Sequence, residues 1–235
     1  MSVLKKIWSN KWMLRSIIPT IYFNLRCLPF KQAVKLPIWL YKPRFGDLSG
    51  TIKIDTDIIK PGMIRLGYHN VGLYANNGIY IQNSGSMIFK GTALIGNDCY
   101  MGVGKSGKII FGDNFRATTT FRITSQCSIA FDYNVRFGWD CLVSDSDFHK
   151  LRKLDGTYTK GYAPIEIGHD CWIANGCRIL KRTKLPAFTT VSAGTILNTP
   201  PKNVPEYSVI GQSREVKVLY TGFYLDPNND DIIID

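Results

Sequence analysis

The sequence lacks several features that common classes of protein require. It contains no CxxC pair although six cysteines are present, so the usual zinc-binding and thiol-disulfide patterns are missing. No run of about 20 apolar residues that could span a bilayer occurs. No small-residue cleavage site of a secretory signal follows Ile21. We therefore expect a protein of the reducing cytoplasm.

Acidic residues are absent from the N-terminal end. Residues 1–46 contain nine of the 29 Lys and Arg residues and no Asp or Glu, whereas the rest of the chain carries 20 basic and 18 acidic residues. The formal net charge of +11 therefore comes mostly from one end. Because the remainder is nearly neutral, we expect no nucleic-acid partner.

The basic end also carries many aromatic and aliphatic side chains. Pro19, Pro29 and Pro37 divide it into short pieces, so residues 1–47 are predicted to form a basic, aromatic, largely helical N-terminal arm. A basic segment with an apolar side suits the surface of an anionic membrane, which would make residues 1–46 a peripheral membrane contact. A helical subdomain that packs on the core or on a neighbouring subunit explains the same composition equally well.

A repeat with a period of six runs through the middle and the C-terminal part of the chain. Residues 167–202 divide into IGHDCW, IANGCR, ILKRTK, LPAFTT, VSAGTI and LNTPPK, and residues 111–146 into FGDNFR, ATTTFR, ITSQCS, IAFDYN, VRFGWD and CLVSDS. A shorter run occupies residues 95–106. A short strand followed by a turn has this period, whereas a helix does not. Three such units would close a triangular coil, and successive coils would stack as parallel strands about 4.8 Å apart.

The repeat also accounts for most of the cysteines. The fifth position of each unit is expected to face the interior near a corner, and it holds Cys99, Cys127, Cys171, Cys177, Thr183, Thr189 and Thr195. We therefore interpret these four cysteines as small residues of the core and not as metal ligands.

The repeat units resemble those of a known family. IGNDCY, IGHDCW and VSAGTI resemble the hexapeptide repeat of left-handed parallel β-helix acyltransferases over roughly residues 50–215. The segments WDCLVSDSDFHKL and PIEIGHDCWIANGCRILK are similar to the branch that O-acetylates galactosides, maltose and polysaccharides. The resemblance implies an all-β chain with a left-handed parallel β-helix at 48–205, a C-terminal segment with an acidic tail at 206–235, and a homotrimer with its active site between neighbouring chains.

One segment does not fit the repeat. The spacing from Cys141 to Ile167 is not a multiple of six, so a loop at 145–166 is predicted to interrupt the stacking with His149 at its base. Transfer of an acyl group to a hydroxyl needs a base with a pKa near neutral, and imidazole is suited to that role. The resemblance implies the same residue, because the essential histidine of the family lies at the matching place.

Two aspartates precede this histidine. Asp145 or Asp147 would accept a hydrogen bond from the other nitrogen of the His149 ring and so orient it. A backbone carbonyl would do the same, and aspartates at the start of a loop often serve only as turn formers. The sequence does not choose among these alternatives.

The resemblance implies acetyl-CoA as the acyl donor, with no metal required. Residues three units apart are expected to stack, which places Ala174 beside Ser192, with Ala193 next in the same stack. The resemblance assigns Ala174 and Ala193 to contacts with the extended pantetheine chain, and Trp172 to the wall of the active-site tunnel. Turn formation and core packing explain these residues equally well.

The phosphates of acetyl-CoA require cations. The candidates are Lys181, Arg182 and Lys217. A solvated surface run of charge is the alternative explanation for each of them.

The function expected from the resemblance is O-acetylation of a sugar hydroxyl in the synthesis of bacterial capsule, O-antigen or exopolysaccharide, with an acceptor that is in some cases lipid-linked. N-acetylation of an amino sugar carried on a nucleotide is one alternative, and a non-catalytic β-helix scaffold is another. A zinc hydratase of similar architecture needs three clustered histidines. His69, His149 and His169 lack the necessary spacing. We expect a cytoplasmic protein, located at the inner face of the membrane if the arm binds lipid.

Overall fold

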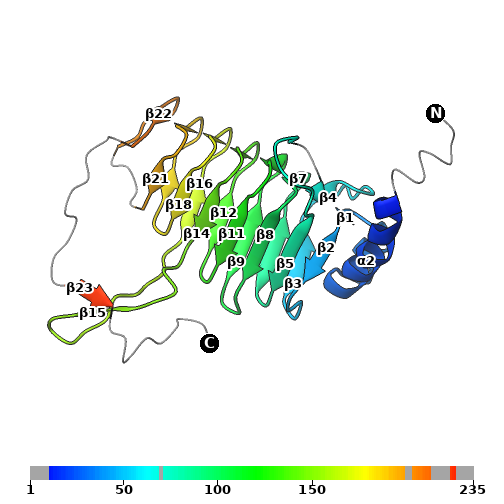
Figure 1. Cartoon of the computed structure of the whole chain (residues 1–235), viewed down its shortest axis with the longest axis horizontal. Coiled ribbons are helices and arrows are strands. Elements are labelled where there is room, and N and C mark those ends of the chain that lie inside the picture. Colours follow the sequence, from blue (N-terminus) through cyan, green and yellow to red (C-terminus); the bar gives the residue numbers. More distant parts are fainter. Residues whose placement is uncertain (1–10, 69–70, 199–202, 213–222, 226–235) are drawn as a thin grey trace.

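The computed structural model describes residues 11–68, 71–198, 203–212 and 223–225. Its body is an elongated parallel β-helix, with α-helices at one end and a projecting hairpin near the other (Figure 1). The helices in these described residues are α2 (Lys11–Cys27) and α3 (Phe30–Ala33).

Consecutive strands of the body go in turn to three parallel sheets, which we name A, B and C. Sheet A contains β1 (Ile38–Leu40), β4 (Ile64–Tyr68), β7 (Ala93–Gly96), β10 (Phe115–Ala117), β13 (Arg136–Phe137), β17 (Trp172–Ile173), β20 (Thr190–Val191) and β22 (Val209–Ile210). Sheet B contains β2 (Pro43–Phe45), β5 (Ile79–Asn83), β8 (Cys99–Val103), β11 (Arg122–Ser125), β14 (Leu142–Ser144), β18 (Arg178–Leu180) and β21 (Ile196–Leu197). Sheet C contains β3 (Thr51–Ile54), β6 (Ser86–Phe89), β9 (Lys108–Phe111), β12 (Ile129–Phe131), β16 (Ile165–Ile167) and β19 (Lys184–Leu185). A fourth sheet pairs β15 (Leu151–Lys153) antiparallel with β23 (Phe223–Leu225).

This arrangement confirms the predicted fold class, a mostly β chain that forms a parallel β-helix after a short helical segment. The chain turns from sheet A to sheet B, from B to C and from C to A at three corners, which we name AB, BC and CA. Residues 174–177, for example, form the AB corner between β17 and β18.

The length of a coil changes along the β-helix. Near the C-terminal end, Ile173 pairs with Val191 and Ile179 with Leu197, so the predicted coil of three units of six is confirmed there. In the middle, Ile109 pairs with Ile129 and Ile123 with Val143, so each of those coils is longer by two positions. The division of residues 111–146 into units of six was therefore wrong.

Side-chain size explains the longer coils. The interior of the middle coils holds five buried phenylalanines, namely Phe111, Phe115, Phe121, Phe131 and Phe137. Their rings contact one another, with centroid distances from 4.8 to 6.0 Å. The shorter coils enclose smaller groups such as Cys171, Cys177 and Thr189. Because interiors are close-packed, a larger filling requires a longer perimeter.

The cysteines lie mostly in the core, as predicted. Cys99, Cys171 and Cys177 are buried at corners, whereas Cys127 is partly exposed. Burial raises the pKa of the Cys99 thiol to about 12, which keeps it protonated. Since a thiolate is the form that binds metals, this environment favours packing as the role of the residue.

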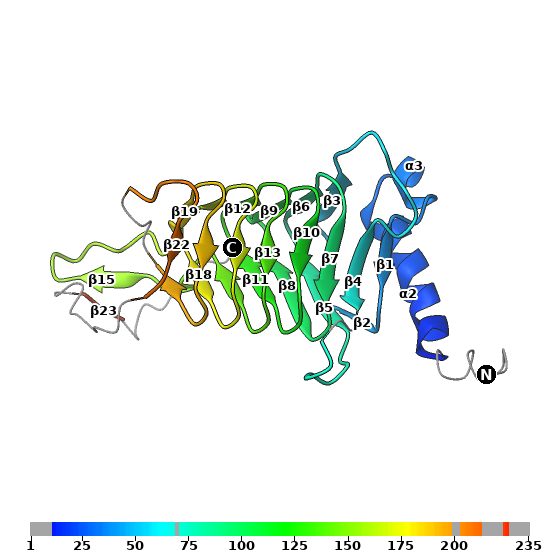
Figure 2. The ribbon, with the colours of Figure 1, turned by 90° about the horizontal axis from the view of Figure 1, so that it is seen from above.

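The helix α2 covers the open edge of sheet A through polar side chains (Figure 2). Asn24 is fully buried, and its amide donates to the Ile38 carbonyl at 2.7 Å while its oxygen accepts from the Ile38 N–H at 3.2 Å. The Thr20 hydroxyl accepts from the Leu40 N–H at 3.1 Å, and the Ser16 hydroxyl accepts from the Lys42 N–H at 3.1 Å. These residues satisfy backbone groups that a preceding strand would otherwise pair.

The short helix α3 caps the open edge of sheet C in the same way. The Gln32 amide donates to the Ile54 carbonyl at 2.8 Å and accepts from the Ile54 N–H at 3.3 Å. Packing on the core is thus one role of the N-terminal arm. No helix in the described part of the chain is long and apolar enough to cross a bilayer.

The β-helix extends beyond the predicted boundaries of 48–205. Its first strand begins at Ile38, inside the segment 1–47 that was assigned to the arm, and its last strand ends at Ile210. The first coils contain prolines and long excursions, such as the one that separates Pro43 from its partner Ile79. No short repeat is therefore visible in that part of the sequence.

The edge-capping role of Asn24 predicts a large effect on stability. Replacing it by alanine leaves the N–H and C=O of Ile38 without partners, so Asn24→Ala should lower the free energy of unfolding by about 2–4 kcal/mol. The exposed neighbour Leu25 provides the control, since Leu25→Ala should change this free energy by only about 0.5 kcal/mol. Urea denaturation measures both values, and equal losses would contradict the capping role.

Candidate functional site

The inserted loop leaves the body at the BC corner, between β14 and β16. The Ala163 N–H donates to the Asp145 carbonyl and the Asp147 N–H donates to the Gly161 carbonyl, and these bonds close its base. Beyond the base, residues 151–159 form a hairpin whose strand β15 pairs with β23 (Figure 1). The stack continues across the insertion, because Leu142 of β14 still pairs with Arg178 of β18. The predicted interruption at 145–166 is therefore an excursion from one corner.

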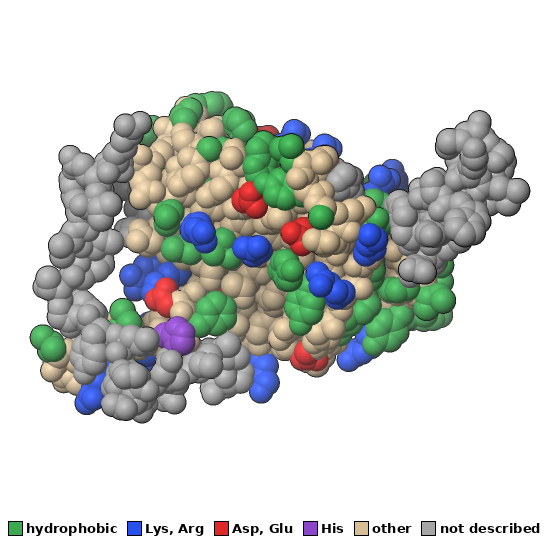
Figure 3. Space-filling view, in the orientation of Figure 1, with side chains coloured by type: hydrophobic (Ala, Val, Ile, Leu, Met, Phe, Trp, Pro, Cys, Tyr) green, Lys and Arg blue, Asp and Glu red, His purple; other side chains and the backbone are tan. Residues whose placement is uncertain are grey.

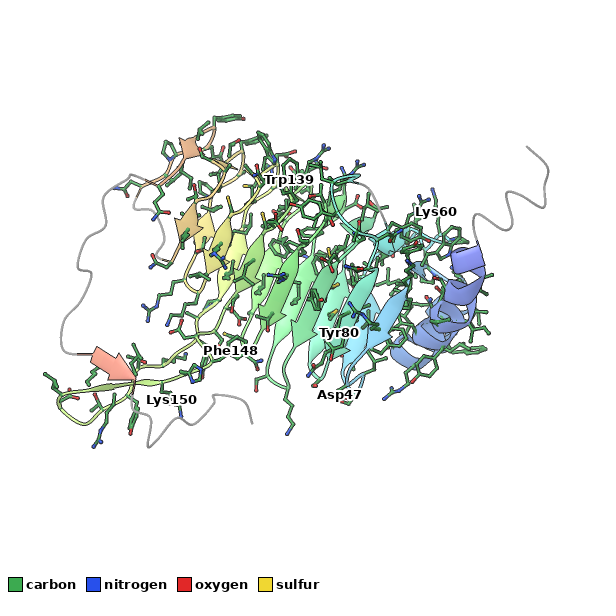
Figure 4. All side chains as sticks on the ribbon, viewed as in Figure 1. Asp47, Lys60, Tyr80, Trp139, Phe148 and Lys150 are labelled. Atoms are coloured by element: carbon green, nitrogen blue, oxygen red, sulfur yellow. The ribbon has the colours of Figure 1, made fainter. Side chains whose placement is uncertain are left out.

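His149 lies at the base of this loop with its side chain partly exposed. The preceding residue, Phe148, has a φ of 61°, in the left-handed region that bulky side chains rarely adopt. Its N–H donates to the Ser146 hydroxyl at 3.0 Å, which holds this conformation. Phe148 lies where the loop leaves the body (Figure 4). The local backbone thus fixes the direction in which the chain presents His149.

Asp145 is completely buried and is committed to a neighbouring turn. Its carboxylate accepts hydrogen bonds from the Ser125 hydroxyl at 2.6 Å, the Gln126 N–H at 2.7 Å and the Cys127 N–H at 2.9 Å. These three donors lie on the preceding coil. Asp145 therefore has a structural role in this turn, and the prediction that Asp145 or Asp147 orients the His149 ring stays a prediction.

Asp147 is exposed, and its carboxylate pairs with the ammonium group of Lys181 from the next coil. Arg182 follows at the same BC corner with a φ of 71° and an exposed side chain. The structure therefore brings Lys181 and Arg182 to the base of the loop. Lys217 lies outside the described residues.

The predicted pantetheine contacts lie elsewhere on the molecule. Trp172 projects from sheet A and is 55% exposed. Ala174 stacks beside Ser192 as predicted, since its N–H donates to the Val191 carbonyl at 2.9 Å. Ala193 is exposed at the AB corner.

Within one chain the two groups of predicted residues are separated. The strand β18 runs between the AB corner, where Ala174 lies, and the BC corner, where Lys181 lies. A single ligand would contact residues at both corners only if it lay across sheet B, or if a second copy of the chain supplied the residues of one corner.

A groove on the outer face of sheet B was not predicted from the sequence. Its volume is about 190 Å³, and it is lined by Tyr80, Tyr100, Gly102, Arg122, Thr124 and Leu142. Hydrophobic, Lys and Arg side chains gather along this face (Figure 3), and Tyr80 stands on it (Figure 4). The groove ends at Leu142, on the strand that leads into the His149 loop. The sequence holds the groove residues one coil apart, so they can be recognised as neighbours only when the coil length is known.

A larger hollow adjoins the groove on the side of the helices. It has a volume of about 580 Å³ and is lined by Lys42, Arg44, Asn76, Asn77, Asp98 and Tyr100. Lys42 donates from its ammonium group to the Asn76 carbonyl at 2.9 Å. Asn77 donates to the Asp98 carboxylate at 3.3 Å. Tyr100 lines both, so the hollow and the groove are neighbours on sheet B.

His169 occupies a different corner from His149. At the CA corner its ring stacks on Tyr133 with a centroid distance of 4.5 Å and meets the edge of Phe188 at 5.0 Å. Hydrogen bonds from His169 and from Asn134 lower the pKa of Asp170. His69 lies outside the described residues. Among those described, no group of three or more His, Cys, Asp and Glu residues is placed to hold a metal.

No family model, curated protein or solved structure matches this chain. The assignment of a function therefore depends on the geometry of the site and on the likeness of the repeat.

The contrast between the two aspartates is testable. Asp145→Ala removes a fully buried carboxylate and leaves the Gln126 and Cys127 N–H groups without this acceptor, so it should lower the free energy of unfolding by about 3–5 kcal/mol. Asp147→Ala removes only a surface ion pair and should lower this free energy by less than about 1 kcal/mol. Urea denaturation of both variants gives the comparison. A variant Asp145→Ala that is as stable as Asp147→Ala would contradict the structural role of Asp145.

Proposed function

We propose that this protein transfers an acetyl group from acetyl-CoA to a hydroxyl of a saccharide, with His149 as the general base. The observation that carries the proposal is the position of His149. It lies at the base of an insertion in the coil stack, and the strand β14 that leads into this insertion carries Leu142, a lining residue at one end of the aromatic and cationic groove. The resemblance of the repeat units and of the segment around His149 to β-helix O-acetyltransferases supports the same chemistry.

In this proposal His149 takes a proton from the acceptor hydroxyl as its oxygen attacks the thioester carbonyl. A carbon–oxygen bond forms, the carbon–sulfur bond breaks, and the proton passes to the departing thiolate to give free coenzyme A. In this proposal Asp145 holds the neighbouring turn through its three hydrogen bonds, at the start of the loop that carries His149. The ion pair of Asp147 with Lys181 stabilises the BC corner beside His149.

The donor surface in this proposal is the stack of Ala174, Ser192 and Ala193, with Trp172 beside it. Because these residues and His149 lie at different corners of one chain, we propose a homotrimer in which the donor surface of one copy faces the loop of its neighbour. The exposed Arg182 is the cation best placed at the loop to meet a phosphate of the donor.

Replacement of the base is the direct test. His149→Ala should lower the turnover number by roughly 100- to 10,000-fold, the range that general-base catalysis supplies. The dissociation constant of acetyl-CoA and the melting temperature should hold, because the donor surface does not include the imidazole. Release of free thiol from acetyl-CoA, measured with a panel of saccharide acceptors, gives the rates.

His169→Ala is the matched control, because His169 stacks on Tyr133 at the CA corner, away from the loop at the BC corner. The turnover number of this variant should stay near that of the unchanged protein. Near-normal turnover of His149→Ala would refute the mechanism. An absence of acetyl-CoA binding would favour a scaffold, and transfer only to amino sugars would favour N-acetylation. Sedimentation of the active protein as a monomer would contradict the shared site.

A further inference from the structure

The outward side chains of sheet B form a continuous row along the molecule. In register from strand to strand they are Arg44, Tyr80, Tyr100, Arg122, Leu142 and Arg178. Neighbouring strands lie about 4.8 Å apart, so the row measures about 19 Å from Arg44 to Leu142. It contains three arginines and no acidic residue. Within the part of the chain that is described, none of these arginines forms an ion pair with a carboxylate.

A glycine, which has no side chain, creates the groove beside this row. Gly102 occupies an outward position of β8, between Gln82 and Thr124 in the register. The Tyr80 and Tyr100 rings lie next to it with their centroids 6.1 Å apart, and the Arg122 guanidinium lies 5.9 Å from the Tyr100 ring. The result is a trough with aromatic walls and a cation at its side.

These features match one class of ligand. Aromatic rings offer flat apolar surface to the C–H faces of sugar rings. Arginine binds carboxylate and phosphate groups through paired hydrogen bonds. The neighbouring hollow adds Lys42 and the amides of Asn76 and Asn77 to Arg44, and its one carboxylate, Asp98, accepts a hydrogen bond from Asn77.

We propose that the groove and the hollow together bind an extended saccharide that carries carboxylate or phosphate groups. The proposed function gives this ligand its role, because the groove ends at Leu142 of β14, the strand that precedes the His149 loop, and the bound chain is then the acetyl acceptor. Its charged groups meet the arginine row and the hollow, and its sugar rings lie over the two tyrosines.

Binding of defined probes tests this site without acetyl-CoA. The probes are maltohexaose, maltohexaose 1-phosphate and an oligogalacturonide of the same length, measured by titration calorimetry. At least one charged probe should bind about tenfold or more tightly than neutral maltohexaose, with an affinity that falls as salt rises. Preference for the oligogalacturonide would assign carboxylates along the chain, and preference for the phosphate probe would assign a terminal phosphate.

Gly102→Leu is the informative variant. A Cβ at Gly102 would lie no closer than 3.6 Å to its nearest neighbour, the Thr124 hydroxyl oxygen, so a larger side chain fits the strand and fills the groove. Gly102→Leu and Arg122→Gln should each weaken binding of the charged probe by about tenfold or more. Ala130→Leu makes a comparable enlargement at an outward position of sheet C and should leave binding unchanged.

Equal binding of neutral and charged probes, or normal binding to Gly102→Leu, would overturn the proposal. The variant His149→Ala should bind the charged probe normally. If it does and no acetyl transfer is found in the unchanged protein, the proposed function is refuted while saccharide binding in the groove is supported. If Gly102→Leu transfers acetyl groups normally, the groove is not the acceptor site while the proposed function is unaffected.

A second inference comes from the helix α2, whose polar side faces inward. Among its described side chains, five exposed residues are large and apolar and between 40% and 78% exposed, and Arg26 is exposed beside them; the apolar ones are Ile17, Ile18, Ile21, Tyr22 and Leu25. Phe30 and Val34 extend this exposed patch beyond α2. The inward polar residues follow from the edge capping, because the open strand needs hydrogen-bonding partners, whereas Phe23 and Cys27 of the same helix join the core.

We infer that this patch binds the surface of an anionic bilayer. The charge of the arm selects this occupant, since residues 1–46 carry nine basic residues and no acidic one. The patch lies at the end of the molecule where α2 packs against β1 (Figure 2). The hollow adjoins the same end, because its residue Lys42 bonds through its N–H to Ser16 of α2.

Flotation with phosphatidylcholine vesicles, with and without phosphatidylglycerol, tests this inference on the full chain. The unchanged protein should float with the anionic vesicles and be released by salt. A double variant, Ile18→Glu with Leu25→Glu, should stay unbound with an unchanged melting temperature, because both side chains are exposed. Leu154→Glu, at an equally exposed site on the hairpin, should float normally. Equal binding to neutral vesicles, flotation of the double variant, or its loss of oligomeric state would overturn the inference.

Discussion

Backbone hydrogen bonds between neighbouring coils are the constraint on which this structure depends. Each short strand satisfies its N–H and C=O groups on the coil before it and the coil after it, so no coil is complete alone. Two consequences follow. Insertions occur at corners, where they leave the ladder intact, as the pairing of Leu142 with Arg178 across the His149 loop demonstrates. The first coil also needs partners of another kind, which Asn24 and Gln32 supply.

The same constraint explains how much of the fold was predictable. In residues 167–197 the interior is filled by Ile, Cys, Thr, Leu and Val of similar size, so the coil length is constant and the period is visible in the sequence. In residues 111–146 phenylalanines fill the interior and each coil is longer by two positions. A period of six can still be read in the sequence there, but it predicts the wrong pairs of neighbouring strand residues. The early coils, with their excursions, had no readable period.

The candidate site was predictable only in part. A histidine at the start of an insertion is visible as a break in the repeat, and the structure has the insertion where the sequence placed it. The roles of the two aspartates were not predictable, because they depend on what the neighbouring coils present. The Ser125 hydroxyl and two N–H groups receive Asp145, whereas Asp147 meets Lys181. The groove on sheet B required the strand register, since its residues are distant in sequence.

The amides of Asn24 and Gln32 act as single-residue substitutes for a strand, and this has a consequence for how the molecule behaves in a crowded solution. A bare strand edge is a template on which another chain can add, and a stack of parallel coils is a natural seed for fibre growth. With the N–H and C=O of Ile38 and Ile54 already occupied, an incoming strand finds no free pairing groups at these two residues of sheets A and C. The side chains that cap the first coil therefore also oppose end-to-end growth of the stack into a fibre.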